Sequence, residues 1–169
     1  MEISISDTNI EGVKIINYDT FSDKRGTIWT TFIDKKLNKL DINKFNHDKF
    51  SLSYKNVIRG IHYDKFTTKL VTIVYGSINQ IVVDMRDDSP TFKQYLSFEL
   101  NNENRFSILI PPMVGNAFQV KSDFALYHYK LSYSGDYQDE DKQFTTKWND
   151  PTIGIKWNCS TPILSNRDS

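Results

Sequence analysis

Residues 57–85 read VIRGIHYDKFTTKLVTIVYGSINQIVVDM and contain three runs of β-branched and aromatic residues. The runs span 57–63, 69–75 and 79–85, and Gly76 marks a tight turn between the last two. Short runs between turn signals predict β-strands. Seven more such runs lie at 13–16, 27–33, 50–54, 95–100, 106–110, 117–120 and 125–131, whereas only 34–40 offers a short helix. This pattern predicts an all-β fold, an antiparallel sandwich or barrel of the jelly-roll kind, with a pocket at its mouth.

The composition fits one soluble domain that spans residues 1–169. The chain is 38% hydrophobic and 14% aromatic, which is typical of a folded domain. Lys plus Arg and Asp plus Glu each number 21, so neither a nucleic acid nor a membrane surface is an expected partner. No apolar run approaches the roughly 20 residues that span a bilayer. The first residues lack the features of a signal peptide, and the single Cys159 excludes an intrachain disulfide. We therefore expect a cytoplasmic protein.

The sequence pattern does not indicate a metal or cofactor site. The three histidines, His47, His62 and His128, lie too far apart for the close ligand spacing typical of zinc or iron sites. The seven glycines are scattered singly, whereas phosphate-binding and dinucleotide-binding loops need glycine clusters. We therefore expect any chemistry to come from side chains alone.

The predicted strand 57–63 is unusual because it carries Arg59, Gly60 and His62 among apolar residues. In a regular strand Arg59 and His62 face opposite sides, because their separation is odd. Both reach one pocket only if Gly60 bulges or twists the strand. The alternative is an edge strand with both side chains in solvent.

A second candidate segment is 125–130, where alternation puts Tyr127 and Tyr129 on one face and His128 on the other. The tyrosines are either core residues with satisfied hydroxyls or, close to His62, a source of a catalytic phenol. In the C-terminal segment, Asp168 either folds back to orient an imidazole or belongs to a frayed end.

Ten short segments, in this order and spacing, resemble the dTDP-4-dehydrorhamnose 3,5-epimerase family over nearly the whole chain. They are 23–26 (DKRG), 57–63 (VIRGIHY), 69–71 (KLV), 83–86 (VDMR), 89–92 (SPTF), 103–104 (EN), 109–111 (LIP), 129–130 (YK), 148–151 (WNDP) and 164–168 (LSNRD). The resemblance implies a cupin-type jelly roll without metal, assembled as a homodimer in which one subunit lends residues to the other's pocket.

The resemblance also implies a cofactor-independent 3- and/or 5-epimerase of a nucleotide-diphosphate-linked 4-keto-6-deoxy sugar. Such an enzyme removes a proton next to the keto group and returns one on the opposite face through an enolate. The matching catalytic positions are His62 as the base, Asp168 as its orienting carboxylate, Tyr129 as the acid and Lys69 as the cation beside the keto oxygen.

The resemblance further implies substrate-binding positions. Arg59 matches a diphosphate contact, and Arg25 matches a contact donated across the dimer. Asn116 replaces a second active-site histidine of the rhamnose-pathway members, whereas His47 and Lys49 stand where those members have Gln and Asn.

Recognition of the nucleotide's base also departs from the rhamnose-pathway pattern. The aromatic residue that stacks on thymine there falls on Ser134 or Gly135, so we expect Tyr133 or Tyr137 to supply the ring. These departures resemble the branch that acts on GDP-4-keto-6-deoxy-heptose in capsular polysaccharide biosynthesis, and we expect a GDP-linked sugar to be favoured over a dTDP-linked one. The alternatives are dTDP-4-dehydrorhamnose 3,5-epimerase proper, a 3,4-ketoisomerase of the same cupin group, and a non-catalytic sugar-binding jelly roll.

Overall fold

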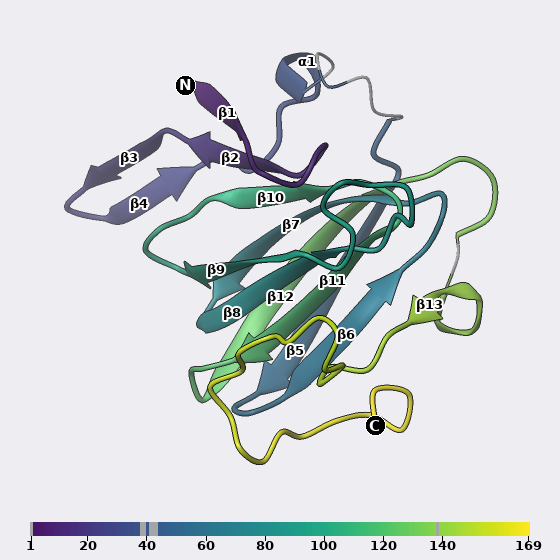
Figure 1. Ribbon diagram of the computed structural model, residues 1–169. Helices are drawn as coiled ribbons and strands as arrows, with labels where there is room; N and C mark the ends of the chain where they lie inside the picture. Colours follow the sequence, from purple (N-terminus) through teal and green to yellow (C-terminus); the bar gives the residue numbers. More distant parts are fainter. Residues whose placement is uncertain (1, 38–39, 41–43, 138) are drawn as a thin grey trace.

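The computed structural model describes residues 2–37, 40, 44–137 and 139–169, and its two main β-sheets pack face to face (Figure 1). The six-stranded sheet has the order β1 (Ile3–Asp7), β2 (Lys14–Tyr18), β10 (Ser107–Ile110), β7 (Thr68–Tyr75), β12 (Phe124–Ser132) and β5 (His47–Tyr54). The five-stranded sheet has the order β13 (Phe144–Thr145), β6 (Ile58–Tyr63), β11 (Val114–Val120), β8 (Ser77–Asp84) and β9 (Tyr95–Asn101). A separate hairpin of β3 (Thr20–Asp23) and β4 (Gly26–Trp29) projects away from both sheets (Figure 1).

Successive strands alternate between the two sheets. Strands β5 and β7 belong to the six-stranded sheet and β6 and β8 to the five-stranded one, and β10, β11 and β12 alternate again after the β8–β9 hairpin. Neighbouring strands within each sheet are antiparallel. This order is that of a jelly roll, and the predicted all-β, cupin-type class is confirmed.

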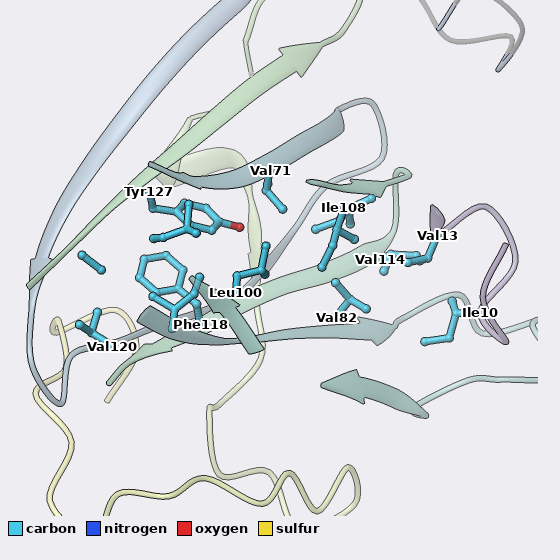
Figure 2. Close-up of a cluster of buried hydrophobic side chains, with 14 residues drawn as sticks. Ile10, Val13, Val71, Val82, Leu100, Ile108, Val114, Phe118, Val120 and Tyr127 are labelled. Atoms are coloured by element: carbon cyan, nitrogen blue, oxygen red, sulfur yellow. The ribbon is translucent and has the colours of Figure 1, made fainter. Parts of the chain in front are cut away.

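The core lies between the sheets, because alternate residues of each strand point inward. Val71 and Ile73 of β7 contribute to it, whereas Leu70 packs on the outer face of the same strand. Figure 2 shows Tyr127 and Phe118 meeting across the two layers, where their rings stack at 4.5 Å. The predicted alternation in 125–130 is confirmed, since His128 points outward and its Nε2 lies 2.7 Å from Asp48 Oδ1.

Loops and terminal segments cover the outer faces of the sheets. Ile153 of the C-terminal segment packs with Ile61 and Ile81 on the five-stranded sheet. Leu37 of the short helix α1 (Asp34–Leu37) packs with Leu70 on the six-stranded sheet. In Figure 1 the C-terminal segment passes below the five-stranded sheet, and Ile163 pairs with Val57 just before β6, which brings the end of the chain close to β6. Among the described residues, no helix is long and apolar enough to cross a membrane.

Some predicted elements differ from the observed ones. The predicted strand 27–33 is a strand only over β4, and the predicted helix 34–40 is seen as α1, with residues 38–39 outside the described part. Strands β1 and β3 were not predicted, because their sequences ISISD and TFSD are largely polar and their side chains are mostly exposed. They are held by pairing with β2 and β4 rather than by burial in the core.

Candidate active site

A bulge in β6 brings two polar side chains to the same side of the strand. His62 pairs with Asn116 and Arg59 with Phe118, so two residues of β6 lie opposite Ala117 alone. Gly60 has a φ of +106°, and a Cβ there would lie 2.4 Å from the backbone oxygen of Asn116. Only glycine fits such a close approach. The predicted bulge is confirmed. Arg59 is exposed at the cavity, but His62 is only 23% exposed, so the alternative with both side chains in solvent is wrong for His62.

The cavity at the mouth of the sandwich has a volume of about 480 Å³. Its walls come from both sheets, with His62 and Asn116 on the five-stranded sheet and Lys69 and Tyr129 on the six-stranded one. The C-terminal segment closes one side with Asp168. The structure therefore gathers all four predicted catalytic residues around one space.

His62 and Asp168 form a hydrogen-bonded pair. His62 Nε2 lies 2.6 Å from Asp168 Oδ1, and Ser165 Oγ donates to Asp168 Oδ2 at 3.0 Å. The Asp168 side chain is only 3% exposed, so the alternative of a frayed end is wrong. Burial, the largest influence, raises the pKa of Asp168, but the hydrogen bond and positive charge of His62, with help from Ser165 and the Gly60 backbone, hold the pKa below its usual value. A carboxylate only accepts, so Nε2 carries the hydrogen and Nδ1 is the nitrogen that can take a proton.

Tyr129 lies on the wall opposite His62. Its ring meets that of Tyr127 edge to face, with the centroids 4.5 Å apart. Burial raises the pKa of Tyr129 above its usual value, and the positive charge of Arg59 offsets this only in part. The phenol therefore stays protonated at neutral pH, which is the form of a proton donor.

Lys69 is buried beside a carboxylate. It shares the inward face of β7 with Val71, and its side chain is 6% exposed. Its Nζ lies 3.8 Å from Asp64 Oδ2, while Asp64 Oδ1 accepts from the backbone N–H groups of Phe66 and Thr67. Burial is the largest influence and lowers the pKa of Lys69, and Asp64 opposes this shift in part. A dehydrated ammonium so placed is suited to stabilising a negative oxygen in the cavity.

Basic side chains gather on the same cavity. Arg59, Lys49 and Arg167 all line it. Arg59 Nε donates to Ser53 Oγ at 2.9 Å, and Arg167 Nε donates to Thr145 Oγ1 at 2.7 Å. Lys49 Nζ lies 3.5 Å from Asp139 Oδ1. Asp139 and Glu140 line the cavity too and Asp139 pairs with Lys49, which leaves Arg59 and Arg167 as the cations suited to a negatively charged ligand.

The remaining predicted residues lie at different places. Asn116 lines the cavity, whereas His47 does not; its ring instead packs against Tyr137, with the centroids 4.8 Å apart. Of the two candidate stacking rings, Tyr137 lines the cavity. Arg25 lies on the β3–β4 turn, where its side chain is 81% exposed and bonded to Asp23, and it does not reach this cavity.

Sequence reasoning missed several residues of the site. Arg167 and Ser165 lie next to Asp168 in the segment 164–168, and this closeness in sequence could have indicated them. Asp64 gave no such signal, because its contact with Lys69 is set by the fold. Among the described residues, no group of three or more His, Cys, Asp and Glu side chains is arranged to hold a metal ion.

Comparison with known proteins identifies the class and the family. Residues 7–169 match the family described as dTDP-4-dehydrorhamnose 3,5-epimerase. The protein of that name from Neisseria gonorrhoeae is 37% identical over 171 residues, which cover 98% of this chain and 51% of that protein. The one from Salmonella typhimurium is 33% identical over 168 residues, covering 96% of this chain and 90% of that protein. The chain thus spans about half the length of the Neisseria relative.

A solved structure agrees in three dimensions. The dTDP-6-deoxy-D-glucose-3,5-epimerase of Legionella pneumophila, crystallised with dTDP-4-keto-L-rhamnose, superposes with a TM-score of 0.91 and 33% identity over 99% of this chain and 90% of that one. The jelly roll is that of nucleotide-sugar epimerases, which are isomerases. The chain belongs to the dTDP-4-dehydrorhamnose 3,5-epimerase family.

Proposed function

We propose that the chain catalyses cofactor-independent 3,5-epimerisation of a dTDP-linked 4-keto-6-deoxy sugar. The observation that carries the proposal is the position of His62 and Tyr129, which enter one cavity from opposite sheets. Inversion at a carbon requires that a proton leaves one face and another arrives on the opposite face. A sugar ring held between the two walls meets this requirement.

The chemistry follows from the groups around the ring. His62 Nδ1 takes the proton from the carbon next to the keto group, and Asp168 stabilises the imidazolium that forms. The electron pair moves onto the keto oxygen, where the ammonium of Lys69 stabilises the enolate. Tyr129 then donates its hydroxyl proton to the other face of the carbon, and exchange with solvent restores both groups.

The rest of the nucleotide extends toward the basic side of the cavity. We assign the diphosphate to Arg59 and Arg167, because its two negative charges match these two guanidinium groups, whereas Lys49 is already paired with Asp139. Tyr137 is the ring we assign to stacking on the base. It lines the cavity together with Arg59 and Arg167, so one cavity would hold both base and diphosphate.

The nucleotide proposed here is thymidine diphosphate. The departures at Ser134 and Gly135 led to the expectation of a GDP-linked heptose, but the relatives reported above are named for dTDP-linked sugars. The GDP-linked heptose therefore has no support among them, and the dTDP-linked alternative fits better.

We further propose a homodimer in which Arg25 reaches the pocket of the partner. The β3–β4 hairpin carries Arg25 away from its own cavity and exposes Phe21 and Ile28, which are 58% and 62% exposed. Mixed dimers of Arg25→Ala and His62→Asn subunits would then regain activity that neither variant has alone, because one of the two pockets is intact. Lack of any regain in proven mixed dimers would exclude the shared site.

The deciding experiment is incubation with dTDP-4-keto-6-deoxyglucose in deuterated water, followed by NMR at C3 and C5. We expect deuterium and inverted configuration at both carbons, and no product with His62→Asn. Turnover of the GDP-4-keto-6-deoxy-heptose alone would reassign the substrate. Binding of the sugar nucleotide without any exchange would make the chain a sugar-binding jelly roll and end the proposal.

A further inference from the structure

A fully buried amide lies directly behind the cavity wall. Gln80 of β8 is 0% exposed, and its Nε2 lies 3.0 Å from the backbone oxygens of both Ile81 and Ala117. The same nitrogen lies 2.7 Å from Asn116 Oδ1. On its other side, Gln80 Oε1 accepts from the Tyr127 hydroxyl at 2.6 Å.

These contacts fix which way both amides point. Backbone oxygens only accept hydrogen bonds, so the end of Gln80 that faces Ile81 and Ala117 must be the nitrogen. Asn116 must then present its oxygen to Gln80, because the reverse orientation would set two N–H donors against each other at 2.7 Å. The Tyr127 hydroxyl also lies 3.3 Å from Asn116 Oδ1, but its single hydrogen is donated to Gln80 Oε1 at 2.6 Å, so the choice rests on Gln80.

The orientation leaves one polar group of Asn116 without a partner. No described residue accepts a hydrogen bond from its Nδ2, although Asn116 is only 7% exposed and lines the cavity. An N–H₂ group on a cavity wall that has no acceptor within the described part of the protein is suited to donate to a bound molecule. The ligand in the cavity is the source of that acceptor.

We propose that Gln80 is a positioning residue that locks Asn116 as a hydrogen-bond donor to an oxygen of the bound sugar. The inference rests on the proposed function and deepens it, because it states what this wall recognises. Nδ2 offers hydrogens and no lone pair, so it selects sugars that present an acceptor oxygen at that point.

The lock also has a consequence for proton transfer. Neither amide titrates in the range in which proteins are folded, so this wall binds the sugar without exchanging protons. His62 and Tyr129 are then the pair that must serve every carbon that the enzyme inverts.

The test separates the sugar subsite from the nucleotide subsite. Isothermal titration is done with dTDP and with dTDP-glucose, which lacks the keto group and does not react. The affinity for dTDP-glucose divided by the affinity for dTDP reports the sugar contacts. We expect Asn116→Asp to lower this ratio about tenfold at neutral pH, because an acceptor replaces the donor, and to leave dTDP binding unchanged. As the pH falls toward the usual carboxyl pKa, the new carboxylate is protonated and can donate again. The affinity ratio of the variant then approaches that of the unaltered protein.

Gln80→Met tests the positioning role, since it keeps the volume but removes the groups that orient Asn116. We expect the same loss in the ratio, in a protein whose thermal transition stays cooperative. Gln119→Met is the matched control, because Gln119 is also buried, at 2% exposure, but its Oε1 accepts from the backbone of Asn158 and does not line the cavity.

The outcomes distinguish the two proposals. If the unaltered protein binds neither dTDP nor dTDP-glucose, the proposed function fails. If it binds both and Asn116→Asp keeps the unaltered ratio, the donor is overturned while the function stands. If Gln80→Met keeps the same affinity ratio as Gln119→Met, the positioning role of Gln80 is overturned.

Discussion

Replacement of Asp168 by asparagine tests the base directly, because it keeps the shape of the side chain and removes its charge. Asp168 Oδ1 accepts from His62 at 2.6 Å while Oδ2 accepts from Ser165. An amide has one accepting end, so it either keeps the bond from His62 or turns its N–H₂ toward Nε2. In the second orientation the imidazole hydrogen moves to Nδ1, and the base is lost.

The size of the effect follows from the bond that is removed. A hydrogen bond to a charged partner contributes about 1.5–3 kcal/mol, and each 1.4 kcal/mol of barrier is about tenfold in rate. We therefore expect kcat of Asp168→Asn to fall about 10- to 100-fold with KM nearly unchanged, because Asp168 supports His62 and not the sugar. His62→Asn, which removes the base itself, is expected to lose about 10²- to 10⁴-fold or more.

The assay is steady-state epimerisation with dTDP-4-keto-6-deoxyglucose, together with a thermal melt of each variant. Asp123→Asn is the control, because that carboxylate is 92% exposed and does not line the cavity. A folded Asp168→Asn protein with unaltered kcat would refute the role of the carboxylate. A raised KM with unaltered kcat would place Asp168 in substrate binding instead.

Three further variants test the acid, the bulge and a buried carboxylate. Tyr129→Phe is expected to keep solvent exchange at the acidic carbon but to lose epimer formation, and NMR of both on one sample checks this; unaltered epimerisation would return the residue to the core. Gly60→Ala is expected to lower the free energy of unfolding by more than about 2 kcal/mol, since its Cβ would lie 2.7 Å from that of Ala117; denaturant titration measures it. Asp84 is 0% exposed, and although burial raises its pKa, hydrogen bonds from Arg86, Ser89 and Thr91 hold that pKa below the usual 3.8. The contribution of this carboxylate to stability is therefore present above pH 3.8 and is lost as the pH falls toward its pKa in the folded protein. Asp84→Asn is expected to lower the free energy of unfolding by about 2–4 kcal/mol at pH 7 and by less in acid. An equal loss at both pH values contradicts this.

Local features of the site could be predicted because strand geometry is local. Alternation alone separates Tyr129 from His128, and the odd spacing of Arg59 and His62 requires the distortion that Gly60 supplies. The same reasoning left the role of each residue open, because a tyrosine on an inner face is compatible with packing and with catalysis.

Other features depend on which strands become neighbours. Gln80 follows Asn79 in a strand that is otherwise mostly apolar, and nothing near it in sequence indicates that Asn116 and Tyr127 are its partners. Their contacts arise from the pairing of β8 with β11 and from the packing of one sheet on the other. The sequence likewise carries no local signal that Asp64 accompanies Lys69, because the two lie on opposite sides of a turn.

The stacked rings of Phe118 and Tyr127 help to fix the distance between the two cavity walls that carry His62 and Tyr129. Phe118 comes from the sheet that carries His62, and Tyr127 comes from the sheet that carries Tyr129, two residues along the same strand. Phe118 lines the cavity and Tyr127 lies behind it in the core, so their 4.5 Å stack helps to set how far apart the two walls stand. A smaller side chain at Tyr127, which does not line the cavity, would change the span between His62 and Tyr129 without removing a wall residue, so the catalytic geometry depends in part on the hydrophobic core.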